Sequence, residues 1–239
     1  MKGKPMQTKL RLNPDDIFIR RIQNALLQHC IAGWRRRSKT LLDINCGDGR
    51  FLRSLWHIGF DVTATEASYD QRLQAARNLG QRAEIYAADD TDLPFDNNQF
   101  DWAVLHLSTT PLTHLDDALK EAARVCEHGL AVTFWNSFSP VLLCHSTKQT
   151  PINAYSWFTI RQTLRSLQLG SINTASTLLF AFDIFRKYCP KIFFNSWKTR
   201  LPFGAWTTIR LDMSPRSTVT PLLLPTRLRK YHNFEPVLE

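Results

Sequence analysis

Residues 41–51 read Leu41-Leu42-Asp43-Ile44-Asn45-Cys46-Gly47-Asp48-Gly49-Arg50-Phe51. We interpret this stretch as a short buried strand that turns sharply into a helix. Such a turn leaves the first backbone N–H groups of the helix without intrahelical partners and brings the main chain close to whatever lies at the carboxyl end of the strand. Gly47 and Gly49 permit this approach because they carry no Cβ atom. The stretch therefore predicts a ligand site where the strand ends.

An acidic residue, Glu66, follows Gly49 by seventeen positions and ends a second apolar strand over residues 61–65. In this place a carboxylate can accept hydrogen bonds from both hydroxyls of a ribose, as in doubly wound nucleotide-binding folds. The turn does not match the dinucleotide fingerprint G-x-G-x-x-G, because Leu52 stands where the third glycine would pack the helix. A nicotinamide-dependent oxidoreductase is therefore disfavoured.

The rest of the chain alternates short strands with helices. We predict helices over residues 13–30, 51–58, 69–79, 114–125 and 155–167, the last ended by Gly170, and strands over residues 83–87, 102–107, 129–134, 172–180 and 206–211. This alternation predicts an α/β fold with a doubly wound, mostly parallel sheet and helices on both faces.

A second informative stretch runs from Ala88 to Asp101 and reads Ala-Asp-Asp-Thr-Asp-Leu-Pro-Phe-Asp-Asn-Asn-Gln-Phe-Asp. An isolated aspartate in such a stretch is commonly just a turn initiator. However, that interpretation does not explain the spacing among the glycine turn, Glu66 and Asp89.

Taken together, residues 38–135 resemble class I S-adenosylmethionine-dependent methyltransferases, specifically a methyltransferase type 11-like domain. In that family an acid-x-Gly-x-Gly-x-Gly run ends the first strand, and a Gly-Asp-x-x-x-Leu-Pro-Phe run follows the third. Here Asn45 replaces the first glycine, and asparagine is the non-glycine residue most tolerant of a positive φ. The resemblance implies a seven-stranded, Rossmann-like sheet that ends in an antiparallel edge pair.

The resemblance also implies S-adenosyl-L-methionine as cofactor. Asp43 and the turn from Gly47 to Gly49 would hold the methionine moiety, with the Asp43 carboxylate pairing with its amino group. Glu66 would hold the ribose and Asp89 the adenine amine. The implied cofactor-binding set is completed by Asn45, Cys46, Ala67, Asp90 and Leu107.

Two histidines are candidate general bases, should the methyl acceptor have to lose a proton. His106 lies inside an apolar strand, where a packed core histidine is the commoner finding, and His114 lies beside the expected methyl site near Ser108 to Thr110. No metal site or nucleophile elbow is predicted. Residues 107–110 are not an Asn-Pro-Pro-Tyr tetrapeptide, which disfavours methylation of a nucleobase amine.

Charge is unevenly distributed. Residues 1–40 contain ten Lys/Arg and two Asp/Glu, residues 41–179 contain ten and fifteen, and residues 180–239 contain ten and four. We predict a basic flexible N-terminus over residues 1–13, a methyltransferase domain over residues 14–212 with an aromatic and basic insertion at about 180–205, and a Pro-rich tail over residues 213–239. The basic ends suit either solvated termini, an anionic membrane surface or nucleic acid.

Five scattered cysteines, no apolar run near membrane-spanning length and no signal-peptide core favour a cytoplasmic protein, with peripheral membrane contact left open. The expected acceptor is a small molecule or a lipid- or quinone-like compound. An RNA or protein methyltransferase and a non-catalytic S-adenosylmethionine-binding module stay open as alternatives, and the sequence sets no oligomeric state.

Overall fold

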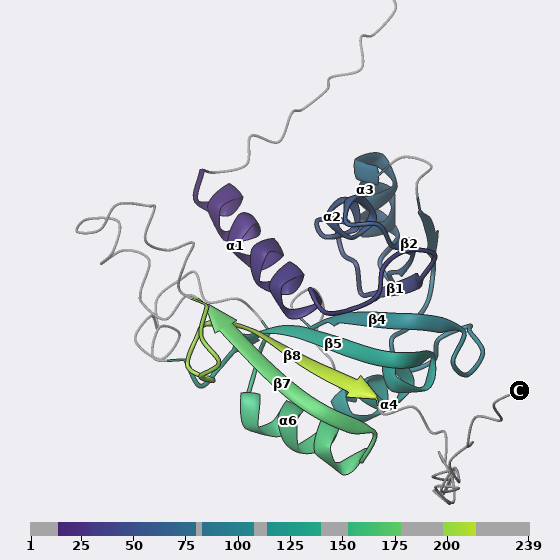
Figure 1. Ribbon diagram of the computed structural model, residues 1–239. Coiled ribbons are helices and arrows are strands. Elements are labelled where there is room, and N and C mark those ends of the chain that lie inside the picture. Colours follow the sequence, from purple (N-terminus) through teal and green to yellow (C-terminus); the bar gives the residue numbers. More distant parts are fainter. Residues whose placement is uncertain (1–13, 80–82, 108–113, 140–152, 178–197, 214–239) are drawn as a thin grey trace, which may run out of the picture.

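The structure is a computed structural model that describes residues 14–79, 83–107, 114–139, 153–177 and 198–213 (Figure 1). Residues 1–13, most of the predicted insertion at 180–205 and the tail after Met213 lie outside the described residues. Within the described residues, no helix is both long enough and apolar enough to cross a membrane.

A single mixed sheet forms the centre of the domain, with the strand order β3-β2-β1-β4-β5-β8-β7. Its strands are β1 (Thr40–Ile44), β2 (Asp61–Thr65), β3 (Glu84–Tyr86), β4 (Phe100–His106), β5 (Cys126–Asn136), β7 (Gly170–Thr177) and β8 (Trp206–Met213). The first five are mutually parallel, and β8 runs antiparallel to both β5 and β7. The predicted fold class, including the antiparallel edge pair, is confirmed.

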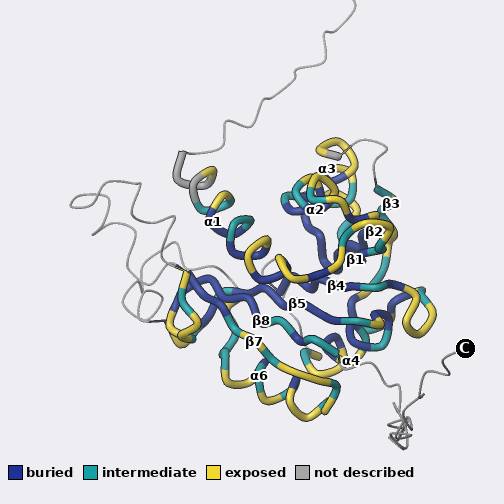
Figure 2. The backbone as a smooth tube through the Cα atoms, in the orientation of Figure 1, coloured by how far each residue is buried: buried dark blue, intermediate teal, exposed yellow. Residues whose placement is uncertain are grey.

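Helices cover both faces of the sheet (Figure 1). One face carries α1 (Pro14–Cys30), α2 (Leu52–His57) and α3 (Tyr69–Leu79), and the other carries α4 (Leu115–Arg124) and α6 (Trp157–Ser166). The central strands are therefore buried on both sides (Figure 2), which explains the uninterrupted apolar run over residues 102–105 of β4.

Each helix turns a small-residue or aliphatic face to the sheet. In α4, the buried positions are Ala118, Leu119, Ala122 and Ala123, which recur at the helical period. On the opposite face, α1 contributes Leu26 and Leu27 to the core cluster that contains β1 and α2. The two cores hold the carboxyl ends of β1, β2 and β4 in fixed positions relative to one another.

Local differences from the prediction concern the chain after β5. A two-residue strand, β6 (Ala154–Tyr155), pairs with the end of β5 where a helix start was expected. Gly170 does not end α6 but begins β7, and the left-handed residue after the helix is Gln168, with φ of 52°. A glycine is therefore not needed at this helix end, although it is the usual choice.

Candidate functional site

The turn between β1 and α2 contains three residues in the left-handed region: Asn45 (φ 58°), Gly47 (φ 58°) and Gly49 (φ 75°). Asn45 thus adopts the conformation that a glycine would otherwise provide. The turn is anchored to β2, because the Cys46 N–H donates to the Thr65 carbonyl at 3.0 Å. The turn therefore lies at the carboxyl edge of the sheet, as the sequence predicts, but the N–H groups of Cys46, Gly47 and Gly49 already have hydrogen-bond partners within the protein.

Gly49 is also a packing position. A Cβ atom there would lie 2.9 Å from the Cα of Ala75 in α3 and 3.0 Å from its Cβ. By contrast, a Cβ at Gly59, which has a φ of +102°, would meet nothing within 4 Å. The bare Cα of Gly49 allows α3 to lie directly against the turn.

We expect Gly49→Ala to lower the free energy of unfolding by about 2 to 5 kcal/mol, because left-handed strain and a backbone clash add together. Gly59→Ala, the matched control, adds only the strain and should cost about 1 to 2 kcal/mol. Urea unfolding followed by circular dichroism measures both. Equal losses in the two variants would contradict the packing role of Gly49.

Glu66 directly follows β2 and is completely buried. Its Oε2 accepts from the Gly47 N–H and its Oε1 from the Ser68 N–H, both at 2.9 Å. Arg72 donates to the carbonyl oxygens of Glu66 and Ala67 and so braces the same segment. Each carboxylate oxygen keeps a second lone pair, so the group is held in place and can still accept from a ligand.

Asp43 lies under the glycine turn, also with no exposed surface. Its Oδ1 is 2.6 Å from Nε2 of His106, and Nδ1 of His106 is 2.7 Å from the hydroxyl of Thr133 on β5. A carboxylate only accepts, so Nε2 carries the proton that is shared with Asp43, while the Thr133 hydroxyl hydrogen-bonds to the other ring nitrogen. The ring also stacks on Phe51, with centroids 4.5 Å apart.

The other oxygen of Asp43, Oδ2, is buried and has no hydrogen-bond partner in the part of the chain that the structure describes. An acceptor left in this state is costly unless a donor reaches it. The Asp43 carboxylate is thus half satisfied by the protein, at the place where the sequence predicts contact with an amino group.

Asp90 joins the β3 side of the site to the glycine turn, because its Oδ2 accepts a hydrogen bond from the Asn45 side-chain amide. Burial raises the pKa of Asp90 to about 6. Asp89 is exposed instead, and hydrogen bonds from the Thr91 backbone N–H and hydroxyl lower its pKa. The adenine role predicted for Asp89 stays a prediction.

Asp90→Asn should stabilise the protein at pH 8 by about 1 to 2 kcal/mol and leave it unchanged near pH 4. The folded state holds the Asp90 proton more tightly than the unfolded state, so wild-type stability falls as pH rises from about 4 to 6. Asparagine avoids this loss and still offers an acceptor to Asn45. Denaturant unfolding across pH 4–8 measures the free energy of unfolding of each variant, and Asp61→Asn, at an exposed aspartate, is the control. A stability gain in Asp90→Asn that does not depend on pH would contradict the prediction.

The remaining predicted residues occupy different environments. The Cys46 thiol and Leu107 are buried, and burial with Asp43 and Glu66 nearby raises the pKa of Cys46. His114 is exposed and precedes α4 without capping it. Ser108 to Thr110, which would border the methyl group, lie outside the described residues.

Two residues of α4 make contacts with the segment after β3 that the sequence did not predict. Glu121 and Arg124 of α4 form an ion pair, Glu121 accepts from the Leu93 N–H, and Arg124 donates to the carbonyl oxygens of Leu93 and Phe95. The helix therefore fixes the Leu-Pro-Phe segment after β3. The sequence shows the spacing of Glu121 and Arg124, but it does not predict that they bind the backbone of the Leu-Pro-Phe segment.

A group of potential metal ligands lies at the opposite, amino edge of β4. Ligand atoms of Asp101, Glu127 and His128 are within 4.8 Å of one another. Burial would raise the pKa of Asp101, but hydrogen bonds from Lys39 and Thr40 lower it, and Lys39 Nζ already lies 2.5 Å from its Oδ1. Asp101 is therefore already paired with a lysine cation.

Comparisons with known proteins agree with this architecture. Residues 42–133 match the family model described as a methyltransferase domain. A malonyl-[acyl-carrier protein] O-methyltransferase from Pseudescherichia vulneris is 36% identical over 100 residues, which cover 41% of this chain and 39% of that protein. The chain thus spans about two fifths of the length of the curated relatives it matches.

Solved structures share the fold at low identity. A S-adenosylmethionine-dependent methyltransferase from Thermotoga maritima superposes with a TM-score of 0.62 at 16% identity, covering 84% of this chain and 94% of that one. Magnesium protoporphyrin IX methyltransferase from Synechocystis PCC 6803, crystallised with S-adenosylmethionine, gives 0.56 at 14% identity, covering 90% and 87%. At such identities the likeness concerns the fold alone.

Proposed function

We propose that this chain, whose residues 42–133 match the model of a methyltransferase domain, binds S-adenosylmethionine and transfers its methyl group to a small organic acceptor. The observation that carries the proposal is the pair of buried carboxylates, Asp43 and Glu66, that flank a left-handed glycine turn at the ends of adjacent parallel strands. Ligands of open α/β sheets bind at this edge.

The residues present fit the cofactor. The buried, unpartnered Oδ2 of Asp43 offers an acceptor to an ammonium group. The spare lone pairs of the fixed Glu66 carboxylate suit two neighbouring hydroxyls. Asp89 and Asp90, at the end of the adjacent strand β3, are proposed to line the adenine side.

When bound, S-adenosylmethionine supplies a methyl group on a positively charged sulfur. The chain's own residues then have to align the acceptor and exclude water, which are the main contributions in a direct displacement. Both ring nitrogens of His106 are engaged, so we assign this histidine to positioning Asp43. His114, which is exposed at the start of α4, stays the candidate base for an acceptor that must lose a proton.

A small-molecule acceptor is favoured because the malonyl-[acyl-carrier protein] O-methyltransferase, which is 36% identical over 100 residues, carries a small organic acid in its name. A lipid- or quinone-like acceptor is included in this proposal. The alternative of an RNA or protein acceptor rests on the basic ends of the chain, and residues 1–13 and 214–239 lie outside the described residues.

Isothermal titration calorimetry with S-adenosylmethionine and S-adenosylhomocysteine tests the binding step. We expect saturable binding of both and none of NAD⁺. Transfer of a radiolabelled methyl group to a panel of organic acids, quinols and RNA then tests the acceptor class. Absence of binding to both sulfur compounds would overturn the proposal, and labelling of RNA alone would overturn its acceptor class.

A further inference from the structure

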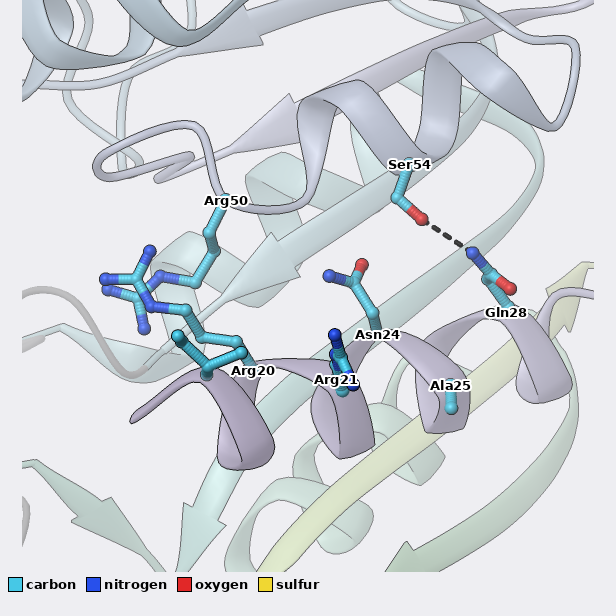
Figure 3. A pocket seen from close by; sticks show the side chains of 8 residues that line it. Arg20, Arg21, Asn24, Ala25, Gln28, Arg50 and Ser54 are labelled. Atoms are coloured by element: carbon cyan, nitrogen blue, oxygen red, sulfur yellow. Dashed lines mark hydrogen bonds between the residues drawn. The ribbon is translucent and has the colours of Figure 1, made fainter. Parts of the chain in front are cut away.

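A hollow of about 430 Å³ lies between α1 and the start of α2, beside the glycine turn (Figure 3). Three arginines line it, Arg20 and Arg21 from α1 and Arg50 from the turn, together with the amides of Asn24 and Gln28. Its volume is within the range of small-molecule sites. None of the residues predicted to bind the cofactor lines this hollow.

The arginines are only partly neutralised. Arg20 Nη2 lies 3.0 Å from Oδ2 of Asp48, and Arg50 Nε lies 2.9 Å from its Oδ1. Burial would raise the pKa of Asp48, but Arg50 and Arg20 lower it, so the carboxylate stays charged. No acidic side chain whose position the structure describes pairs with Arg21, so the described ion pairs set one aspartate, Asp48, against the three arginines of the lining.

Shared pairing with Asp48 also orients two of the guanidinium groups. Because Asp48 stands between Gly47 and Gly49, these groups are fixed to the turn itself. Opposite them, the Gln28 amide donates to the Ser54 hydroxyl at 2.6 Å and links α1 to α2. The Asn24 amide is directed into the hollow between Arg50 and Gln28 (Figure 3), and its Oδ1 has no hydrogen-bond partner among the described residues.

We propose that this hollow binds an anionic group of the methyl acceptor, either a phosphate or a carboxylate. The inference rests on the proposed function, because it assigns the substrate class of that same site. Guanidinium groups bind both anions through paired N–H donors, and arginine is the usual residue for this recognition. The hollow borders the glycine turn, so an anion held there would place the rest of the acceptor near the cofactor site.

The test uses the full chain and two probes, inorganic phosphate and malonate, titrated by calorimetry with and without saturating S-adenosylhomocysteine. We expect one probe to bind in both conditions, and Arg21→Gln to weaken it about fivefold to tenfold. Arg37→Gln, which removes an exposed arginine that does not line the hollow, is the matched control and should have no effect. The affinity for S-adenosylhomocysteine should stay unchanged in both variants.

The outcomes separate this inference from the proposed function. If Arg21→Gln weakened S-adenosylhomocysteine but neither anion, the hollow would hold the cofactor, and the inference would be wrong while the function stood. If Arg21→Gln and Arg37→Gln weakened the affinity for the anion equally, binding would depend only on the net charge of the surface, and the inference would be wrong. Binding of an anion by a chain that does not bind S-adenosylhomocysteine would overturn the acceptor role and the proposed function together.

Discussion

Replacing Glu66 with glutamine is expected to weaken the binding of S-adenosylmethionine roughly 100- to 1000-fold. The carboxylate already accepts from the N–H groups of Gly47 and Ser68, one on each oxygen. A glutamine must turn its NH₂ toward one of these donors, which displaces the side chain. The lost hydrogen bonds to a charged group are worth about 1.5 to 3 kcal/mol each, and 1.4 kcal/mol is a tenfold change in affinity.

Glu84→Gln is the matched control, because Glu84 is an exposed glutamate at the start of the neighbouring strand β3. It should bind the cofactor as the wild type does. Calorimetry gives the affinities, and thermal unfolding shows that both variants remain folded at the measuring temperature. A folded Glu66→Gln with wild-type affinity would remove Glu66 from the cofactor site.

His106→Phe is expected to lower the free energy of unfolding at pH 8 by about 3 to 5 kcal/mol. Phenylalanine preserves the stacking on Phe51 but leaves the completely buried Asp43 carboxylate without a partner, and breaking a buried pair in this way costs about that amount. A histidine that acted only as a catalytic base would instead lose activity with little change in stability.

A double variant separates the charge effect from simple packing. Asp43→Asn combined with His106→Phe removes the unpaired charge, so it should be less destabilised than His106→Phe alone. Urea unfolding at pH 8 measures the difference between the two variants. Equal stability of His106→Phe and the wild type would contradict the positioning role.

The parts of the site that lie at strand ends could be predicted from the sequence. Glu66 and Asp43 stand at or near the ends of apolar strands, and the carboxyl ends of parallel strands meet at one edge. Spacing along the chain therefore brought Asp43, the glycine turn and Glu66 together correctly. The strand and helix alternation likewise determined the fold class.

Contacts between side chains from distant segments could not be predicted. His106 follows Asp43 by 63 positions, and their pairing depends on β4 lying directly beside β1. The same holds for Arg20 and Asp48, which meet because α1 crosses over the sheet. The identity of one residue does not determine which side chain from a distant segment will contact it in the folded protein.

The sequence also did not predict which non-glycine residues adopt a left-handed backbone conformation. Gln168 takes the left-handed place after α6, although Gly170 is two residues away. Tertiary pairing of β7 with β8 begins at Gly170 and takes precedence over the usual glycine cap.

The position of β8 has a consequence for biosynthesis. Residues 206–213 leave the ribosome after every other described strand, yet they pair with β5 on one side and β7 on the other. Until β8 is delivered, the nascent polypeptide exposes an unpaired edge of β5, whose interior residues are almost wholly apolar, and such edges promote aggregation. Chains interrupted before Trp206 are therefore expected to depend on chaperones or to be degraded.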